Sequence, residues 1–164
     1  MTGIVILSGT RSAIGTFGGA LSGFTPIELA TQVSRSAIAR AGISAEQIGH
    51  VVFGHVLNTQ PRDMYLSRVA SVDAGVPVGT PAMNVNRLCG SGLQAMVSVI
   101  QSLMLKDADF GLAGGAEVMS RAPYIIPSAR FGQKMGDAQV TDMMVGALTC
   151  PFGTGHMGIT AENV

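Results

Sequence analysis

The amino-acid sequence predicts an α/β fold in which helices cover both faces of a mainly parallel sheet. Across residues 1–119, short apolar runs of strand length alternate with longer segments of helical periodicity. Alternation of this kind is typical of strands joined by crossover helices. After residue 119 the sequence becomes rich in Pro, Gly and Met and loses its periodicity, which predicts a long loop region.

The predicted elements follow in order along the chain. The apolar run 3–8 is typical of a strand buried on both faces. A helix is predicted to begin after Thr25, because Thr25 and Glu28 can form a capping box, and to end at Gly42. The remaining elements alternate, with strands at 50–56, 81–86 and 109–118 and helices at 64–74 and 91–105.

Two of these segments predict more than their secondary structure. The helix at 91–105 is apolar nearly all round, so we expect it to be buried between layers. Residues 160–164 resemble a capped helix start, and a helix of that length is not stable by itself. We therefore expect the chain to be the first part of a longer protein.

The composition supports this expectation. The 164-residue chain is 47% hydrophobic and only 12% charged, whereas soluble domains are about 25% charged. Such a surface is expected to be covered, either by the rest of a longer chain or by other subunits; an unusually apolar monomer is the alternative.

Charge and hydropathy exclude several classes of partner. The formal net charge is zero and no basic run is present, which argues against a nucleic-acid partner. The apolar runs are too short to span a bilayer, and no secretory signal is visible, so no membrane partner is expected. We expect a cytoplasmic protein with reduced cysteines, although an organelle protein lacking its transit peptide would look the same.

Cys89 is the candidate nucleophile. It lies in the segment 86–92, between a predicted strand and a predicted helix, where Gly90 and Gly92 supply a permissive backbone. A reactive side chain at such a strand-to-helix turn forms a nucleophile elbow. The helix N-terminus would favour the thiolate, and its N–H groups could stabilise an oxyanion on a thioester. The alternative is a small cysteine that only packs.

The same glycines offer a competing interpretation. Residues 90–95 fit the G-x-G-x-x-A pattern of dinucleotide-binding folds. That pattern requires an acidic residue at the end of the next strand, about 20 residues further on. Asp109 stands at the beginning of its strand and Glu117 lies too far along, so the sequence disfavours this interpretation.

The segment around Cys89, Asn-Arg-Leu-Cys-Gly-Ser-Gly-Leu-Gln-Ala, resembles the active-site cysteine segment of thiolases, and it differs from that of the related ketoacyl synthases. Further segments resemble thiolases in the same order along the chain, namely residues 10–15, 114–120, 135–137 and 156–164. The resemblance therefore covers almost the whole chain.

The thiolase resemblance implies a layered fold of two similar halves, of which this chain supplies the first. Residues 1–119 would form the half-domain that carries Cys89, and residues 120–164 would begin a loop domain that contacts pantetheine and builds a tetramer. Cys89 would accept an acyl group from an acyl-CoA, and the carbanion of a second acyl-CoA would then attack it, in a reversible Claisen condensation. The family's catalytic histidine and second cysteine lie in its C-terminal half, so residues 1–164 alone are expected to be inactive.

The same resemblance places His156 and Met157 in the pocket for the pantetheine and acyl groups, although His156 by itself would suggest a structural role. CoA thioesters are the implied substrates, with no cofactor. No metal is expected, because His50 and His55 should point to opposite faces of one strand and no C-x-x-C is present. Cys150 matches no motif. A non-catalytic relative that only binds acyl-CoA is the alternative function.

Overall fold

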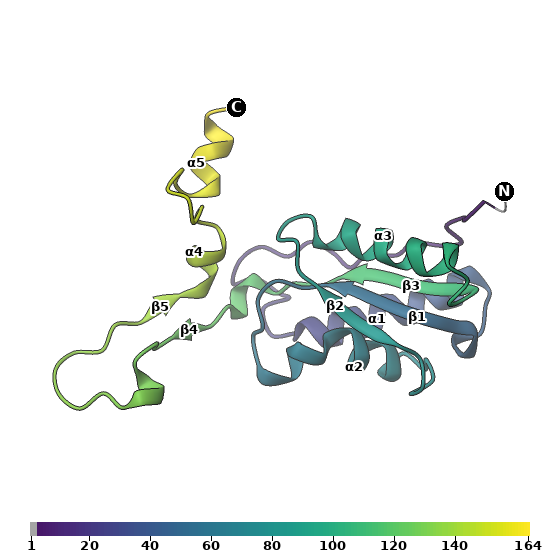
Figure 1. The fold of residues 1–164 in the computed structure, drawn as a ribbon, viewed down its shortest axis with the longest axis horizontal. Helices are drawn as coiled ribbons and strands as arrows, with labels where there is room; N and C mark the ends of the chain where they lie inside the picture. Colours follow the sequence, from purple (N-terminus) through teal and green to yellow (C-terminus); the bar gives the residue numbers. More distant parts are fainter. Residues whose placement is uncertain (1–2) are drawn as a thin grey trace.

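The computed structural model describes residues 3–164, and its layered part is built on a sheet of three parallel strands (Figure 1). The strands are β1 (Ile48–Gly54), β2 (Ala82–Val85) and β3 (Phe110–Gly115), in the order β2-β1-β3. Their register is continuous apart from one irregularity near the start of β1. The parallel sheet predicted from the sequence is confirmed; β2 and β3 are shorter than expected, and β1 begins and ends two residues earlier than predicted.

Helices cover both faces of this sheet, as predicted. Figure 1 shows α1 (Pro26–Ala41) and α2 (Leu66–Asp73) on one face and α3 (Ser91–Met104) on the other. Single 3₁₀ turns at Ala45–Gln47 and Pro61–Tyr65 lead into β1 and α2. No helix among residues 3–164 combines the length and apolar composition that crossing a bilayer requires.

The ends of α1 follow from its sequence. The N–H of Glu28 donates to the Thr25 hydroxyl at 3.2 Å, and the N–H of Thr25 donates to the Glu28 carboxylate at 2.7 Å. This reciprocal capping box satisfies backbone donors that the helix itself leaves unpaired. Gly42 ends the helix with φ +68°, a left-handed conformation that glycine adopts without strain.

The core is divided between the two faces of the sheet. The larger cluster lies between the sheet and the α1–α2 layer and is centred on Val51, Phe53 and Leu66, all at most 1% exposed. The smaller cluster joins α3 to the opposite face through Val52, Ala95 and Val99. The two clusters hold the carboxyl ends of the strands in place.

The helix predicted at 91–105 forms at that position, but it is not buried between layers as expected. Only Ser91, Ala95 and Val99 of α3 are buried, all on the face toward the sheet. Leu93 and Met104 on other faces are 69% and 70% exposed. The apolar periphery of the helix has no covering layer among the residues that the structure describes.

The strand predicted at 3–8 does not form. The segment is extended, but its backbone makes no ladder hydrogen bond, and Val5 and Ile6 are 72% and 73% exposed. A strand requires a neighbour to accept and donate its backbone hydrogen bonds, and none of the described strands lies beside this segment. Side chains tie it to α1 instead: the Ser8 hydroxyl donates to the Ala37 carbonyl and the Thr10 hydroxyl to the Val33 carbonyl.

Beyond the layers the chain forms an arm that projects away from the sheet (Figure 1). It contains the antiparallel pair β4 (Tyr124–Ile125) and β5 (Thr141–Asp142), followed by α4 (Met143–Ala147) and α5 (Met157–Glu162). Short 3₁₀ turns at Met119–Arg121 and Ala129–Phe131 interrupt it. The helix start predicted at Thr160 is wrong, because Thr160 lies inside α5, whose N-cap is His156.

Candidate active site

Cys89 lies on the turn that joins β2 to α3, at the carboxyl edge of the sheet, and it is exposed. The residue before it, Leu88, has φ +48°. A left-handed conformation costs a residue with a Cβ about 1–2 kcal/mol. The sequence predicted the turn but attributed its unusual backbone to Gly90 and Gly92; neither has positive φ, and Leu88 adopts the left-handed conformation instead.

Two side chains hold this turn. The N–H of Leu88 donates to Asn86 Oδ1 at 3.0 Å. The Ser91 hydroxyl accepts the N–H of Arg87 at 2.8 Å and donates to the carbonyl of Leu88 at 2.6 Å. The strained residue is therefore hydrogen-bonded on both of its backbone groups, which offsets the cost of its conformation.

The turn leaves backbone N–H groups within a few residues of Cys89 without acceptors. Among residues 3–164, the N–H groups of Cys89, Gly92 and Leu93 donate to no acceptor. The latter two belong to the first turn of α3, where the helix dipole favours negative charge. An anion bound beside the Cys89 thiol would therefore be stabilised, as the oxyanion of a reacting thioester requires.

The first turn of α3 rests directly on the last residue of β1. A Cβ placed on Gly54 would lie 2.5 Å from the carbonyl carbon of Ser91 and 2.7 Å from the nitrogen of Gly92. Since ordinary contacts are 3.4–4 Å, only glycine allows this approach. The approach fixes the height of Cys89 above the sheet edge.

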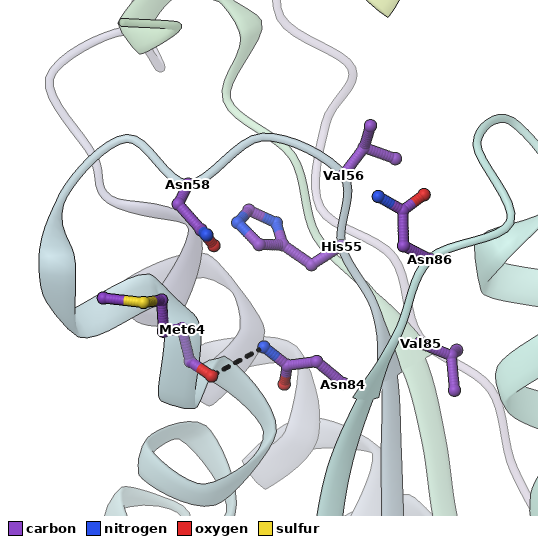
Figure 2. Close-up of a pocket in the computed structure, with 7 residues that line it drawn as sticks. All are labelled: His55, Val56, Asn58, Met64, Asn84, Val85 and Asn86. Atoms are coloured by element: carbon purple, nitrogen blue, oxygen red, sulfur yellow. Dashed lines mark hydrogen bonds between the residues drawn. The ribbon is translucent and has the colours of Figure 1, made fainter.

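A hollow of about 230 Å³ opens beside the start of the turn (Figure 2). It is lined by residues at the ends of β1 and β2, together with Asn58 and Met64. Figure 2 shows the imidazole of His55 between Asn58 and Asn86. The side-chain amide of Asn84 below it already has hydrogen-bond partners within the protein. Its Nδ2 donates to the Met64 carbonyl at 3.2 Å, and its Oδ1 accepts the N–H of Ser67 at 2.8 Å.

The buried His55 pairs with Glu117, whose side chain is partly exposed. Nδ1 of His55 lies 2.8 Å from the Ala116 carbonyl oxygen and 3.3 Å from the Glu117 carboxylate. Because both neighbours are acceptors, Nδ1 carries the proton, and the buried Nε2 has no partner among the described residues. The Glu117 carboxylate also accepts the N–H groups of Val56 and Leu57 at 2.9 and 3.0 Å. The pair thus ties the ends of β1 and β3 together.

His156 and Met157 lie on the arm, at the start of α5. Nδ1 of His156 accepts the N–H of Gly158 at 3.0 Å, so this side chain caps the helix. Met157 is 38% exposed. In Figure 1, α5 stands apart from the layers that carry Cys89, and residues 3–164 do not bring the predicted pocket residues to the predicted nucleophile.

Cys150 has a more polar environment than the sequence indicated. It was expected only to pack or to be an exposed thiol, but it lies half-buried in a loop closed by the hydrogen bond from its N–H to the Gly155 carbonyl. A hydrogen bond from the Thr154 side chain, followed by those from the N–H groups of Thr154 and Phe152, lowers the pKa of the Cys150 thiol. The short loop brings these donors to the sulfur, which no recognised motif would reveal.

Other features of the site were also missed from the sequence. The roles of Gly54 and the His55–Glu117 pair depend on contacts between distant segments, although the glycine at the end of an apolar strand was a visible signal of close approach. The role of Ser91 depends on the backbone conformation of the turn, to which its hydroxyl is hydrogen-bonded. Within the described part of the chain, no three His, Cys, Asp or Glu side chains converge where a metal ion could bind. His55 was predicted to lie on the same strand as His50. The β1 strand ends at Gly54, so His55 instead follows the strand.

Comparison with known proteins identifies the fold. The model of the thiolase N-terminal domain matches residues 4–164. The chain is 59% identical over 161 residues to the beta-ketothiolase BktB of Cupriavidus necator, covering 98% of this chain and 41% of that protein. It is 38% identical to the mitochondrial 3-ketoacyl-CoA thiolase of Bos taurus, covering 100% of this chain and 42% of that protein.

Solved structures agree with these relatives. Human mitochondrial 3-ketoacyl-CoA thiolase in complex with CoA superposes with a TM-score of 0.91 and 37% identity, over 96% of this chain and 40% of that one. The acetyl-CoA acetyltransferase of Bacillus anthracis gives a TM-score of 0.90 and 36% identity, over 97% of this chain and 40% of that one. The chain thus spans about two fifths of the length of its relatives. It belongs to the thiolase family and carries that family's N-terminal domain.

Proposed function

We propose that the protein containing this chain is a thiolase acyltransferase, which condenses an acyl-CoA with acetyl-CoA and, in reverse, cleaves a 3-ketoacyl-CoA with CoA. The observation that carries the proposal is the exposed Cys89 thiol on a strained turn beside free N–H groups, in a chain that matches the thiolase domain from residue 4 to 164. The relatives named for acetyl-CoA and 3-ketoacyl-CoA support CoA thioesters as the substrates.

In the proposed first half-reaction, the Cys89 thiolate attacks the carbonyl carbon of an acyl-CoA, and the carbonyl π electrons move to oxygen. The N–H groups of Cys89 and of the first turn of α3 donate to this oxyanion. When the tetrahedral intermediate collapses, the bond to CoA breaks, and the departing CoA thiolate takes up the proton that Cys89 released. The acyl group remains on the sulfur of Cys89.

In the second half-reaction, acetyl-CoA loses an α-proton and its carbanion attacks the carbonyl of acyl-Cys89. The C–S bond breaks, so that a 3-ketoacyl-CoA leaves and the Cys89 thiolate is regenerated. The thiolase resemblance assigns these proton transfers to a histidine and a second cysteine of the family's C-terminal half. Thiolysis runs through the same intermediates in the opposite order.

The arm would complete the substrate site. We infer that residues 1–119 form the half-domain of the nucleophile, and that residues 120–164 belong to a loop domain in which His156 and Met157 contact the pantetheine and acyl groups. We also infer a cytoplasmic homotetramer that functions in fatty acid metabolism and is assembled partly through this arm. The exposed apolar side chains of the arm, such as Phe131 at 88% and Phe152 at 91%, support a role in assembly. Sedimentation of the intact protein tests the oligomeric state.

Replacing the nucleophile tests the proposed reaction. Cys89→Ser in the intact enzyme should lower the kcat of thiolysis by about 10³-fold or more with unchanged circular dichroism, because a serine hydroxyl is barely ionised near neutral pH. Cys150→Ser is the matched control and should retain thiolysis. If the wild-type protein binds acyl-CoA but never turns it over, the non-catalytic alternative is correct.

A further inference from the structure

We propose that Ser91 is a positioning residue for Cys89, a role that rests on the proposed acyl transfer. Its hydroxyl holds the peptide plane between Leu88 and Cys89 so that the N–H of Cys89 faces away from the helix and toward the substrate. Ser91 does not touch the substrate in this proposal. It acts through the turn.

The hydrogen bonds of Ser91 support this role directly. The Leu88 carbonyl accepts both the Ser91 hydroxyl at 2.6 Å and the Ser91 N–H at 3.0 Å. In a trans peptide, the carbonyl of one residue and the N–H of the next point in opposite directions. Fixing the Leu88 carbonyl on Ser91 therefore turns the N–H of Cys89 outward, which agrees with its lack of any partner among the described residues.

The turn needs such a restraint because Leu88 is strained. At φ +48°, this residue would relax toward the ordinary right-handed or extended regions if its neighbours released it. Either change rotates the peptide plane that carries the N–H of Cys89. The Ser91 hydroxyl opposes the rotation on both sides of the strained residue, because it also accepts the N–H of Arg87 at 2.8 Å.

The position of Ser91 makes the restraint rigid. The residue is only 5% exposed, and its first helical turn is pressed against Gly54 at the end of β1. The hydroxyl thus connects the backbone of Arg87 and Leu88 to a helical turn that lies against the end of β1. Cys89 itself contributes no comparable contact, since it is exposed.

The test compares Ser91→Ala with Ser102→Ala in the intact enzyme. Ser102 lies on the same helix but makes no side-chain hydrogen bond to the turn. We expect Ser91→Ala to lower the kcat of thiolysis by about 10- to 100-fold with KM changed less than about 3-fold, because a reacting group is misplaced while substrate binding remains. Ser102→Ala should leave both constants within about 2-fold of the wild type.

Two further measurements separate positioning from simple loss of structure. In the Leu88→Gly background, Ser91→Ala should cost less kcat than in the wild-type background, because glycine adopts positive φ without strain. The pH profile of Cys89 alkylation by iodoacetamide should also change in Ser91→Ala, and this readout does not require thiolase activity. If the circular dichroism spectrum shows that Ser91→Ala is unfolded, the comparison uses two other variants. The double variant Leu88→Gly/Ser91→Ala is then assayed against Leu88→Gly.

An active wild type in which Ser91→Ala keeps its kcat and its alkylation profile would overturn the positioning role while leaving the proposed function intact. Equal costs of Ser91→Ala in the two backgrounds would also contradict it. A wild type that never acylates Cys89 would instead refute the proposed function, and the alkylation profile would then still decide whether Ser91 sets the environment of the thiol.

Discussion

Gly54→Ala is predicted to displace the turn that carries Cys89, because Gly54 at the end of β1 lies directly against the first turn of α3. The new Cβ would stand 2.5 Å from the carbonyl carbon of Ser91 and 2.7 Å from the nitrogen of Gly92, where ordinary contacts are 3.4–4 Å. Both are backbone atoms, so no side chain can rotate away. The first turn of α3 must therefore retreat by about 1 Å, and a displacement of that size can lower a rate by about 10²-fold.

The same substitution should also lower stability, by about 1–3 kcal/mol, as overpacking of a core contact does. Thermal unfolding and thiolysis kinetics of the intact enzyme measure the two effects. Gly79→Ala is the control, since a Cβ there would meet no atom within 4 Å. If Gly54→Ala kept the wild-type kcat and melting temperature, the contact between β1 and α3 would not position Cys89.

Three further predictions concern charge and capping. Thr154→Val should raise the pKa of the Cys150 thiol and slow its alkylation at pH 8, because the largest stabilising hydrogen bond to the thiolate is lost; an unchanged rate would contradict that environment. Hydrogen bonds from Thr25 lower the pKa of Glu28 below its ordinary value of 4.5, so the stability they give is present above that pH and lost as the pH falls through the folded value. The melting temperature of Glu28→Gln should therefore lie below that of the wild type at pH 7, and the difference should shrink as the pH falls below 4.5. A difference that stays constant down to acid pH would exclude the ionised capping box. Glu117→Ala should lower the free energy of unfolding of the intact protein by about 1–3 kcal/mol in denaturant unfolding, because it leaves the N–H groups of Val56 and Leu57 without their acceptor. A change below about 0.5 kcal/mol would contradict this role of the carboxylate.

The helix at 26–41 and the three strands could be predicted because their signals are local. A capping box, a terminal glycine and short apolar runs act within a few residues, and α1 begins and ends where they indicate. The turn with Cys89 was also predictable, since it needs only a short segment between a predicted strand and a predicted helix. These features depend little on what lies elsewhere in the chain.

The errors share a different cause. Whether residues 3–8 form a strand depends on a neighbouring strand, and whether α3 is covered on all sides depends on a further layer. Neither property is contained in the segment itself. The start of α5 was misplaced because histidine is a rare N-cap, so Thr160 gave a stronger signal than His156. The positive φ of Leu88 could not be predicted, because leucine rarely adopts it and the neighbouring glycines were the stronger signal.

The most direct test of the central claim is to trap the acyl-enzyme. The intact enzyme is incubated with acetyl-CoA, quenched in acid and digested, and its cysteine peptides are analysed by mass spectrometry. The account predicts an added acetyl group on the peptide that contains Cys89 and none on the peptide that contains Cys150. An acetyl group on Cys150 alone, or an enzyme that turns over while Cys89 remains unmodified, would contradict the assignment of Cys89 as the nucleophile.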